Sequence, residues 1–578
     1  RYLLKDREGR VVETPDELFR RVARAVAAAE ERYAEGARGR WEGRFYEALA
    51  ERWFLPNSPT LMNAGTSLGQ LAACFVLPVE DSIEGIFGAV ANMATIHQTG
   101  GGTGFSFSRL RPAGDIVHET GGVASGPVSF MRVFDVATDV VKQGGRRRGA
   151  NMGVLSVDHP DILAFVTAKD DRGALTNFNL SVAVPDAFMA AVEQGAPWEL
   201  VNPRTAKAVG AVAARELWEA ICGAAWRNGD PGLLFIDEVN RHNPTPRAGR
   251  IEATNPCGEQ PLLPYEACTL GSINLARLAA GGTFAWDRLD ELVELGVRFL
   301  DDVVDVSRFP LREVEKATRR TRKIGLGVMG LAEALIELGM PYSSEAARAF
   351  AGQVMERISG RAREASVALA GERGSFPAFD ESVWPDRGYG AMRNASLTTV
   401  APTGTLSIIA NTSSGIEPLF ALAYRRTALD GAELSEVNGL FLEALRERGV
   451  DAGVVLPRVE ETGSVRGVEE VPAEIRALFE VAFDVAPEDH VKMQAAVQAH
   501  TDNAVSKTVN LASTATVDDV REVFELAYRL GCKGVTVFRY GCRGEQVLSL
   551  GKIPSFALGD EAARAHGEFT GECRVCST

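Results

Sequence analysis

The chain has 578 residues with 62 Lys and Arg against 77 Asp and Glu, and its formal net charge is −15. Its 46% hydrophobic and 24% charged fractions are typical of a globular protein and exclude a disordered one. The acidic balance argues against nucleic-acid binding, which needs a basic face. No apolar run approaches the roughly 18 residues of a membrane span, and no secretory leader opens the sequence. We therefore expect a cytoplasmic enzyme with no nucleic-acid or membrane partner.

Two helical patterns open the chain. Thr14 can cap a helix, Pro15 suits its first turn, and Glu17 completes a capping box. Apolar residues then keep helical spacing up to Tyr33, and a second such pattern ends before Pro56. We expect residues 1–55 to form a small N-terminal helical cap.

The main body, residues 56–544, alternates short apolar stretches with helical patterns. The stretches 406–410 and 535–538 look like strands, and 346–369 has helical periodicity. This alternation predicts an α/β fold. Residues 545–578 have little apolar periodicity, and we expect them to form a flexible C-terminal tail.

The most informative motif is Asn255-Pro256-Cys257-Gly258-Glu259. Pro256 and Gly258 disfavour a helix, so we expect an extended loop. Alternate residues of an extended chain share one face at intervals of about 6.6–7 Å, which would align an amide, a thiol and a carboxylate. Such a row can hold a hydroxyl, donate a hydrogen atom and accept a proton. Taken alone, the motif fits equally a turn with an incidental cysteine.

Other cysteines extend the pattern. Cys74 lies in the apolar segment 71–75, Cys268 follows Cys257 by eleven residues, and Cys573 and Cys576 form a C-x-x-C near the end of the sequence. A C-x-x-C is either a dithiol that exchanges with disulfides or half of a zinc site. Because zinc needs four ligands and the sequence has no second C-x-x-C, we favour exchange and expect no metal.

Three glycine-rich segments suggest that the protein handles nucleotides. Residues 100–104 lack the spacing of a dinucleotide or Walker loop, whereas 401–405 offer hydroxyls and backbone N–H groups to a phosphate. Residues 144–149 contain three consecutive arginines suited to a phosphorylated ligand, although an arginine run is also typical of a solvated surface.

Together these motifs resemble the catalytic subunits of ribonucleotide reductases, most closely the adenosylcobalamin-dependent (class II) reductases. The resemblance implies an α/β fold, a ten-stranded α/β barrel whose central finger loop holds Cys257. The matching motifs are residues 57–61 (Asn-Ser-Pro-Thr-Leu), 73–78 (Ala-Cys-Phe-Val-Leu-Pro), 255–259, 402–405 (Pro-Thr-Gly-Thr), 413–418 (Ser-Ser-Gly-Ile-Glu-Pro), 502–508 (Asp-Asn-Ala-Val-Ser-Lys-Thr) and 531–537 (Gly-Cys-Lys-Gly-Val-Thr-Val).

The resemblance also implies a role for each catalytic residue. Cys257 would become a thiyl radical and abstract the ribose 3′-hydrogen, Glu259 would deprotonate the 3′-hydroxyl, and Asn255 would bind the ribose hydroxyls. Cys74 and Cys268 would supply two electrons and end as a disulfide. The tail pair Cys573 and Cys576 would reduce that disulfide and be recharged by thioredoxin or glutaredoxin.

Further residues match the family's binding sites. The implied substrate is a ribonucleotide, by analogy a diphosphate, and the effector is a deoxynucleotide or ATP. The 169–177 stretch would lie between effector and substrate. The expected substrate contacts are Thr60, Ala73, Cys74, Gly102, Asn255, Pro256, Cys257, Gly258, Glu259, Pro402, Thr403, Gly404, Thr405 and Leu406, and the expected effector contacts are Asp81, Arg111, Arg146, Arg147 and Arg148.

The radical source follows from a missing motif. Di-iron reductases relay a radical through two adjacent tyrosines, whereas residues 534–540 read Gly-Val-Thr-Val-Phe-Arg-Tyr and the sequence has no Tyr-Tyr pair. The resemblance therefore implies adenosylcobalamin as cofactor and, from the nearest class, a homodimer. Two alternatives remain: the large subunit of a di-iron reductase, and a catalytically silent nucleotide-sensing homologue.

Overall fold

A computed structural model describes residues 2–117, 122–141, 149–171, 173–427 and 433–542. The arginines at 146–148 and the tail pair Cys573 and Cys576 lie outside these residues. Within the described ranges, no helix is both long and apolar enough to cross a membrane.

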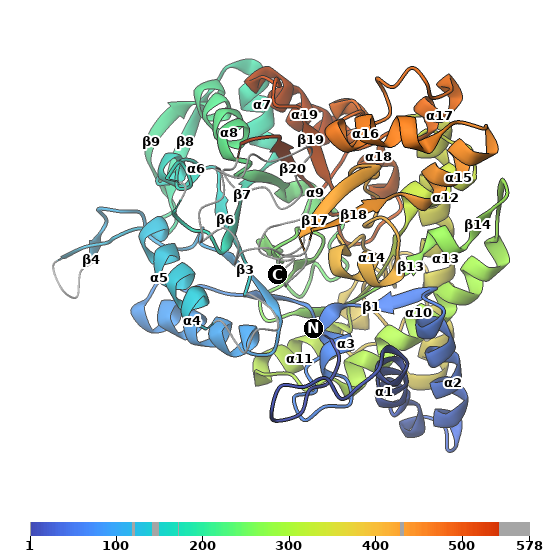
Figure 1. Ribbon diagram of the computed structural model, residues 1–578. Coiled ribbons are helices and arrows are strands. Elements are labelled where there is room, and N and C mark those ends of the chain that lie inside the picture. The colour runs from blue at the N-terminus through green and yellow to red at the C-terminus, as the bar shows by residue number, and fades with distance from the viewer. Residues whose placement is uncertain (1, 118–121, 142–148, 172, 428–432, 543–578) are drawn as a thin grey trace.

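The chain begins with the helical region expected from its sequence. Helix α1 (Pro15–Ala27) is capped by Thr14, which accepts a hydrogen bond from the backbone N–H of Glu17 in a capping box. This confirms the predicted helix start. Helix α2 (Ala37–Ala50) packs against α1, and both contact α10 (Trp286–Val306), as Figure 1 shows at the lower right.

The body is built around one ten-stranded sheet, which confirms the predicted α/β barrel. Five strands run parallel in the order β2-β3-β6-β7-β10, and antiparallel pairings of β10 with β20 and of β2 with β13 join them to the rest. The strands are β1 (Phe54–Pro56), β2 (Cys74–Leu77), β3 (Gly102–Ser106), β6 (Asn151–Ser156), β7 (Phe178–Val184), β10 (Gly232–Phe235), β13 (Ala267–Asn274), β16 (Ile324–Met329), β19 (Thr508–Leu511) and β20 (Gly534–Arg539).

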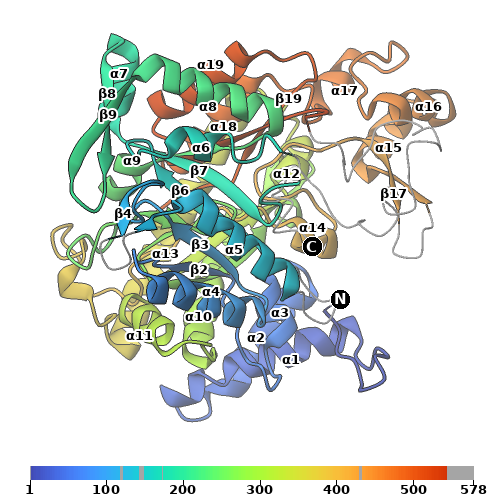
Figure 2. The same ribbon diagram turned by 90° about the vertical axis from the view of Figure 1, so that its left-hand side faces the viewer.

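Two isolated bridges close the barrel. Leu326 of β16 pairs in parallel with Thr398, and Val400 pairs in parallel with Val505, which leads into β19. Helices cover the outside of the sheet, and Figure 2 shows α4 and α5 beside strands β2 and β3. Their bounds are α3 (Ser58–Asn63), α4 (Ile83–His97), α5 (Pro127–Val140), α6 (Ile162–Val166), α7 (Asp186–Gln194), α8 (Ala214–Asn228), α9 (Ile236–Arg241), α11 (Arg312–Thr321), α12 (Leu331–Glu337), α13 (Glu345–Arg373), α14 (Gly404–Ala410), α18 (Pro487–Gln498) and α19 (Val517–Arg529).

The expectation of a strand at residues 406–410 is wrong, because they belong to helix α14. Thr403 adopts a left-handed conformation and turns the chain directly into the helix. A short apolar run fits a buried helix as well as a strand, and hydrophobic periodicity cannot separate the two at this length.

A smaller lobe with its own apolar cluster follows α14. Its buried side chains include Leu422, Phe441 and Val459. The lobe contains β17 (Ala423–Thr427), β18 (Glu433–Val437), α15 (Gly439–Glu447), α16 (Ala452–Thr462) and α17 (Ala473–Leu478), and the remaining short strands are β4 (Ile116–Val117), β5 (Gly122–Val123), β8 (Pro197–Asn202), β9 (Lys207–Ala213), β11 (Ala253–Thr254), β12 (Pro261–Leu262), β14 (Ala279–Ala280) and β15 (Thr283–Phe284).

The hairpin β11–β12 forms the finger loop inside the barrel. A Cβ atom added to Gly104 of β3 would lie 1.8 Å from the carbonyl oxygen of Thr254 in β11. A Cβ on Gly102 would lie 3.1 Å from the Cγ of Pro256. The strand facing the finger therefore needs glycine for the two backbones to approach.

We predict that Gly104→Ala lowers the free energy of unfolding by about 1–3 kcal/mol, because one of two packed backbones has to move. The control is Gly360→Ala in α13, where an added Cβ meets nothing within 4 Å. Urea denaturation of the two variants and of the wild type measures the free energy of unfolding. Gly360→Ala should gain up to about 1 kcal/mol of helix stability. Equal stability of Gly104→Ala and wild type would contradict the close approach.

Candidate active site

Cys74 and Cys268 lie directly opposite each other on antiparallel strands β2 and β13. Directly opposed residues in such a pair have Cα atoms about 4.5–5.5 Å apart, which is within the range that a disulfide bridges. Both side chains are buried, and both cysteines are unbridged thiols here. Burial raises the pKa of the Cys268 thiol, which lies 3.6 Å from the carbonyl oxygen of Lys323.

The Asn-Pro-Cys-Gly-Glu motif occupies the tip of the finger hairpin. The expectation of an extended loop is wrong, because the N–H of Gly258 donates to the Asn255 carbonyl at 3.1 Å and closes a β-turn. The physical reason is turn chemistry: Asn at the first position, Pro at the second and Gly at the fourth favour a type I turn. The N–H of Asn255 also donates to the Gln260 carbonyl at 3.2 Å, which completes the hairpin end.

The turn brings its two polar side chains to Cys74. Asn255 donates from Nδ2 to the Cys74 Sγ at 3.1 Å, and the Cys74 thiol lies 3.8 Å from Glu259 Oε1. The Asn255 side chain is itself held in place, because its Oδ1 accepts the N–H of Gln260 at 2.9 Å. An amide, a carboxylate and one member of the opposed dithiol therefore meet at one point.

A cavity opens beside these groups and is bordered by most of the expected substrate contacts. Thr60 does not border it: its hydroxyl donates to the Leu71 carbonyl at 2.9 Å. Gly258 borders a different cavity. Asn57 and Ser58 line this cavity and were not expected, although both belong to the motif at 57–61. The expected residues that line it are Ala73, Cys74, Gly102, Asn255, Pro256, Cys257, Glu259, Pro402, Thr403, Gly404, Thr405 and Leu406.

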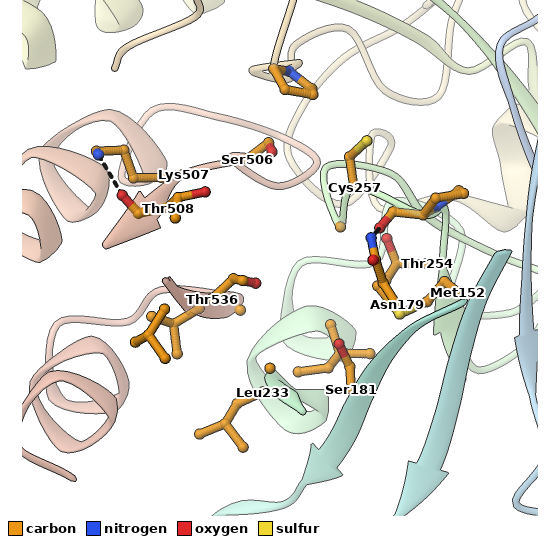
Figure 3. Close-up of a pocket in the computed structure, with 18 of the residues that line it drawn as sticks. Met152, Asn179, Ser181, Leu233, Thr254, Cys257, Ser506, Lys507, Thr508 and Thr536 are labelled. Atoms are coloured by element: carbon orange, nitrogen blue, oxygen red, sulfur yellow. Dashed lines mark hydrogen bonds between the residues drawn. The ribbon is translucent and has the colours of Figure 1, made fainter. Parts of the chain in front are cut away.

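Cys257 also borders a second cavity, which Figure 3 shows in close-up. Its walls come from β7, β10, β20, α18 and the residues before β19. Asn179 of β7 donates to the Pro256 carbonyl at 2.8 Å and so attaches the turn to this wall. Cys257 therefore stands between two cavities, one lined by Cys74 and one without it. Sequence reasoning missed the second cavity, whose residues lie far apart in the chain.

The expected effector residues lie away from both cavities. Arg111 donates from Nε to Asp81 Oδ2 at 2.8 Å, immediately before helix α4. The 169–177 stretch is anchored at both ends: Lys169 pairs with Asp230 at 3.0 Å, and the N–H of Asn177 donates to Asp135 at 2.8 Å. Asp230 lines the second cavity. The structure thus brings Asp81 and Arg111 together, while residues 146–148 lie outside the described ranges.

The chain belongs to the ribonucleotide reductase family. The model of the ribonucleotide reductase barrel domain matches residues 72–538, and that of the ribonucleotide reductase all-alpha domain matches residues 1–69. A nucleotide substrate and a nucleotide effector are therefore its ligands. Its fold is that of a solved structure, the Actinobacillus ureae class Id ribonucleotide reductase alpha subunit, with a TM-score of 0.76 and 23% identity over 93% of this chain and 95% of that one.

Two relatives are more similar in sequence. The vitamin B12-dependent ribonucleoside-diphosphate reductase of Mycobacterium tuberculosis is 56% identical over 99% of this chain and 82% of its own length. The protein of the same name from Thermoplasma acidophilum is 48% identical over 95% of this chain and 79% of its own length.

We predict that a mild thiol oxidant links Cys74 to Cys268, because the strand register already places them opposite each other. The experiment uses a Cys573→Ser/Cys576→Ser variant treated with diamide, digested without reduction and analysed by mass spectrometry. Cys222 in α8 and Cys532 before β20 are internal controls, since both are buried like Cys74 and Cys268 but neither lies in a strand of the sheet. Linkage of Cys74 to any cysteine other than Cys268 would contradict the pairing.

Proposed function

We propose that this chain reduces ribonucleoside diphosphates to 2′-deoxyribonucleoside diphosphates with adenosylcobalamin as radical generator. The observation that carries the proposal is the position of Cys257 between two cavities, only one of which contains Cys74, Asn255 and Glu259. The names of the M. tuberculosis and T. acidophilum relatives support both the diphosphate substrate and the cofactor.

The second cavity fits the nucleoside half of such a cofactor. It combines apolar walls from β10 and β20 with polar side chains such as Asn179, Ser181 and Thr536, and ligand sites typically pair an apolar lining with a few placed polar groups. Phe538 lines it on β20, beside Arg539 rather than in a tyrosine pair. When bound, adenosylcobalamin supplies the radical that removes the hydrogen atom from the Cys257 thiol.

The residues of the first cavity account for the chemistry on the ribose. The Cys257 thiyl takes the 3′-hydrogen while Glu259 accepts the 3′-hydroxyl proton, and Asn255 orients the hydroxyls. The 2′-hydroxyl then leaves as water, taking one thiol proton. Cys74 and Cys268 together lose two electrons and two protons and form one disulfide. One proton leaves in the water and the other ends in the new C2′–H bond, which balances the reduction. Cys257 returns a hydrogen atom to C3′.

The remaining partners belong to the same proposal. We place Cys573 and Cys576 as the dithiol that reduces the Cys74–Cys268 disulfide by thiol exchange, with thioredoxin or glutaredoxin as their own reductant. Asp81, Arg111 and residues 146–148 are the effector contacts that we propose, because Asp81 and Arg111 lie together at the start of α4.

The test separates hydrogen abstraction from reduction. With adenosylcobalamin, dithiothreitol and a 3′-tritiated ribonucleoside diphosphate, wild type should release tritium and form deoxynucleotide. Cys257→Ser should do neither, whereas Cys74→Ser and Cys268→Ser should release tritium and free base without deoxynucleotide. Glu259→Gln should be slower by about 10²–10⁴-fold, the range for losing a general base.

Two results would contradict the proposal. Deoxynucleotide formation by Cys257→Ser would remove the radical role of that residue. A wild-type chain that is inert with adenosylcobalamin but active with a di-iron partner protein would make it the large subunit of a di-iron reductase.

A homodimer also belongs to the proposal, and the outer face of α4 and α5 supports it. Ile83 and Phe87, one turn apart on α4, are 60% and 50% exposed, and Val136 and Val140, one turn apart on α5, are 62% and 78% exposed. The two helices pack side by side (Figure 2). Two adjacent apolar stripes suit a second copy of the same helix pair, which would form a symmetric four-helix contact.

We predict that Phe87→Glu combined with Val140→Glu converts a dimer into a monomer, because four charges would be buried at the symmetric contact. Light scattering coupled to gel filtration measures the mass. The matched control is Leu530→Glu, an exposed leucine (43%) after α19 that should leave the dimer intact. A dimer that persists in the double variant would place the interface elsewhere.

A further inference from the structure

The second cavity is bordered by a carboxylate that the reaction on the ribose of the substrate does not use. Glu417 lines this cavity with its side chain 12% exposed, and Lys507 lies beside it with its side chain fully buried. Glu417 Oε1 accepts the backbone N–H of Thr508 at 2.8 Å, and Oε2 accepts a hydrogen bond from the Lys507 ammonium. Figure 3 shows Lys507 and Thr508 on the side of the cavity away from Cys257.

The Lys507 ammonium is committed to protein acceptors. Its three N–H groups have three acceptors, namely Glu417, the Thr508 carbonyl at 2.8 Å and His490 Nδ1 at 2.8 Å. His490 donates from Nε2 to the Ala482 carbonyl at 3.0 Å, so its Nδ1 accepts. Burial and the adjacent Lys507 charge lower the pKa of His490, which keeps the ring neutral. Lys507 therefore holds Glu417 from behind and has no donor left for a ligand.

Glu417 keeps the capacity to accept further hydrogen bonds. A carboxylate has about four lone-pair directions, and two are used by Thr508 and Lys507. The ligand groups that match two adjacent acceptors of a carboxylate are two adjacent hydroxyls, as in a ribose 2′,3′-diol. Binding of ribose hydroxyls by a carboxylate is a general mode of nucleotide recognition.

We propose that Glu417 binds the ribose diol of a nucleoside in the second cavity, and that Lys507 and His490 are positioning residues that fix its carboxylate. The inference rests on the proposed function, in which that nucleoside is the adenosyl half of the cofactor. The substrate ribose lies in the other cavity with Asn255 and Glu259, so the protein has separate carboxylates for two riboses.

The experiment measures ligand binding rather than turnover. Isothermal titration of the full chain compares 5′-deoxyadenosine with its 2′-deoxy and 3′-deoxy analogues. Wild type should bind 5′-deoxyadenosine about 10- to 100-fold more tightly than either analogue, the usual effect of a hydrogen bond to a charged group. Glu417→Gln should bind all three alike, and Lys507→Met should reduce the preference because the carboxylate is no longer held.

Glu333→Gln is the matched control. Glu333 of α12 braces the same loop from outside both cavities, with its Oε2 accepting the N–H of Ser413 at 2.9 Å and the hydroxyl of Thr412 at 3.0 Å. If Glu417 only held the loop, both glutamine variants would behave alike. We expect Glu333→Gln to keep the full preference for 5′-deoxyadenosine.

Three outcomes would overturn the inference. Equal binding of the three nucleosides by wild type does so without any variant, and therefore does not depend on whether Glu417→Gln folds. A preference that survives in Glu417→Gln assigns the diol to another group. A wild-type chain that turns over with adenosylcobalamin yet does not bind 5′-deoxyadenosine overturns the inference alone, whereas a chain with neither property removes the proposed function as well.

Discussion

The finger hairpin can enter the barrel only where the surrounding backbone has no side chains. Gly104 on β3 meets Thr254 of the finger, and a Cβ on Gly327 of β16 would lie 2.0 Å from the carbonyl oxygen of Thr399. The Thr399 hydroxyl donates to the Glu259 carbonyl at 2.8 Å, so the segment packed on Gly327 also holds the finger. These backbone contacts fix the position of Cys257 inside the barrel. Because of that position, Cys257 separates two cavities.

A second buried cluster of charges is held together by ion pairs, because an unpaired buried charge is costly. Although burial alone would raise it, the guanidinium groups of Arg322, Arg393 and Arg373 lower the pKa of Asp301 to about 2. Arg373 also donates to Glu30 at 2.7 Å, which ties the N-terminal helices to α10 and α13. The Glu417–Lys507–His490 group is paired in the same way, but two of its members, Glu417 and Lys507, line a cavity. Because the carboxylate of Glu417 keeps acceptor capacity there, we assign it a ligand.

The sequence predicts those features that depend on local chemistry. The capping box of α1, the cysteines and the finger motif all stand in short stretches of neighbouring residues. Prediction from the sequence fails where a conformation depends on packing between distant segments. The turn at 255–258 could have been predicted from the Asn-Pro-x-Gly order. The pairing of Cys74 with Cys268 followed only from the family resemblance, because strand register across almost 200 residues sets it. The second cavity has no sequence signal, because Asn179, Glu417 and Lys507 meet only in the folded barrel.

The central claim is that the Cys257 thiol is the reactive group that connects the cavity of the radical source with the cavity of the substrate. Its most direct test uses adenosylcobalamin tritiated at the 5′-carbon of the adenosyl group and follows tritium exchange into water without substrate. The account predicts exchange by wild type, by Cys74→Ser and by Cys268→Ser, because each retains the Cys257 thiol, and none by Cys257→Ser. Exchange at the wild-type rate by Cys257→Ser would contradict the account.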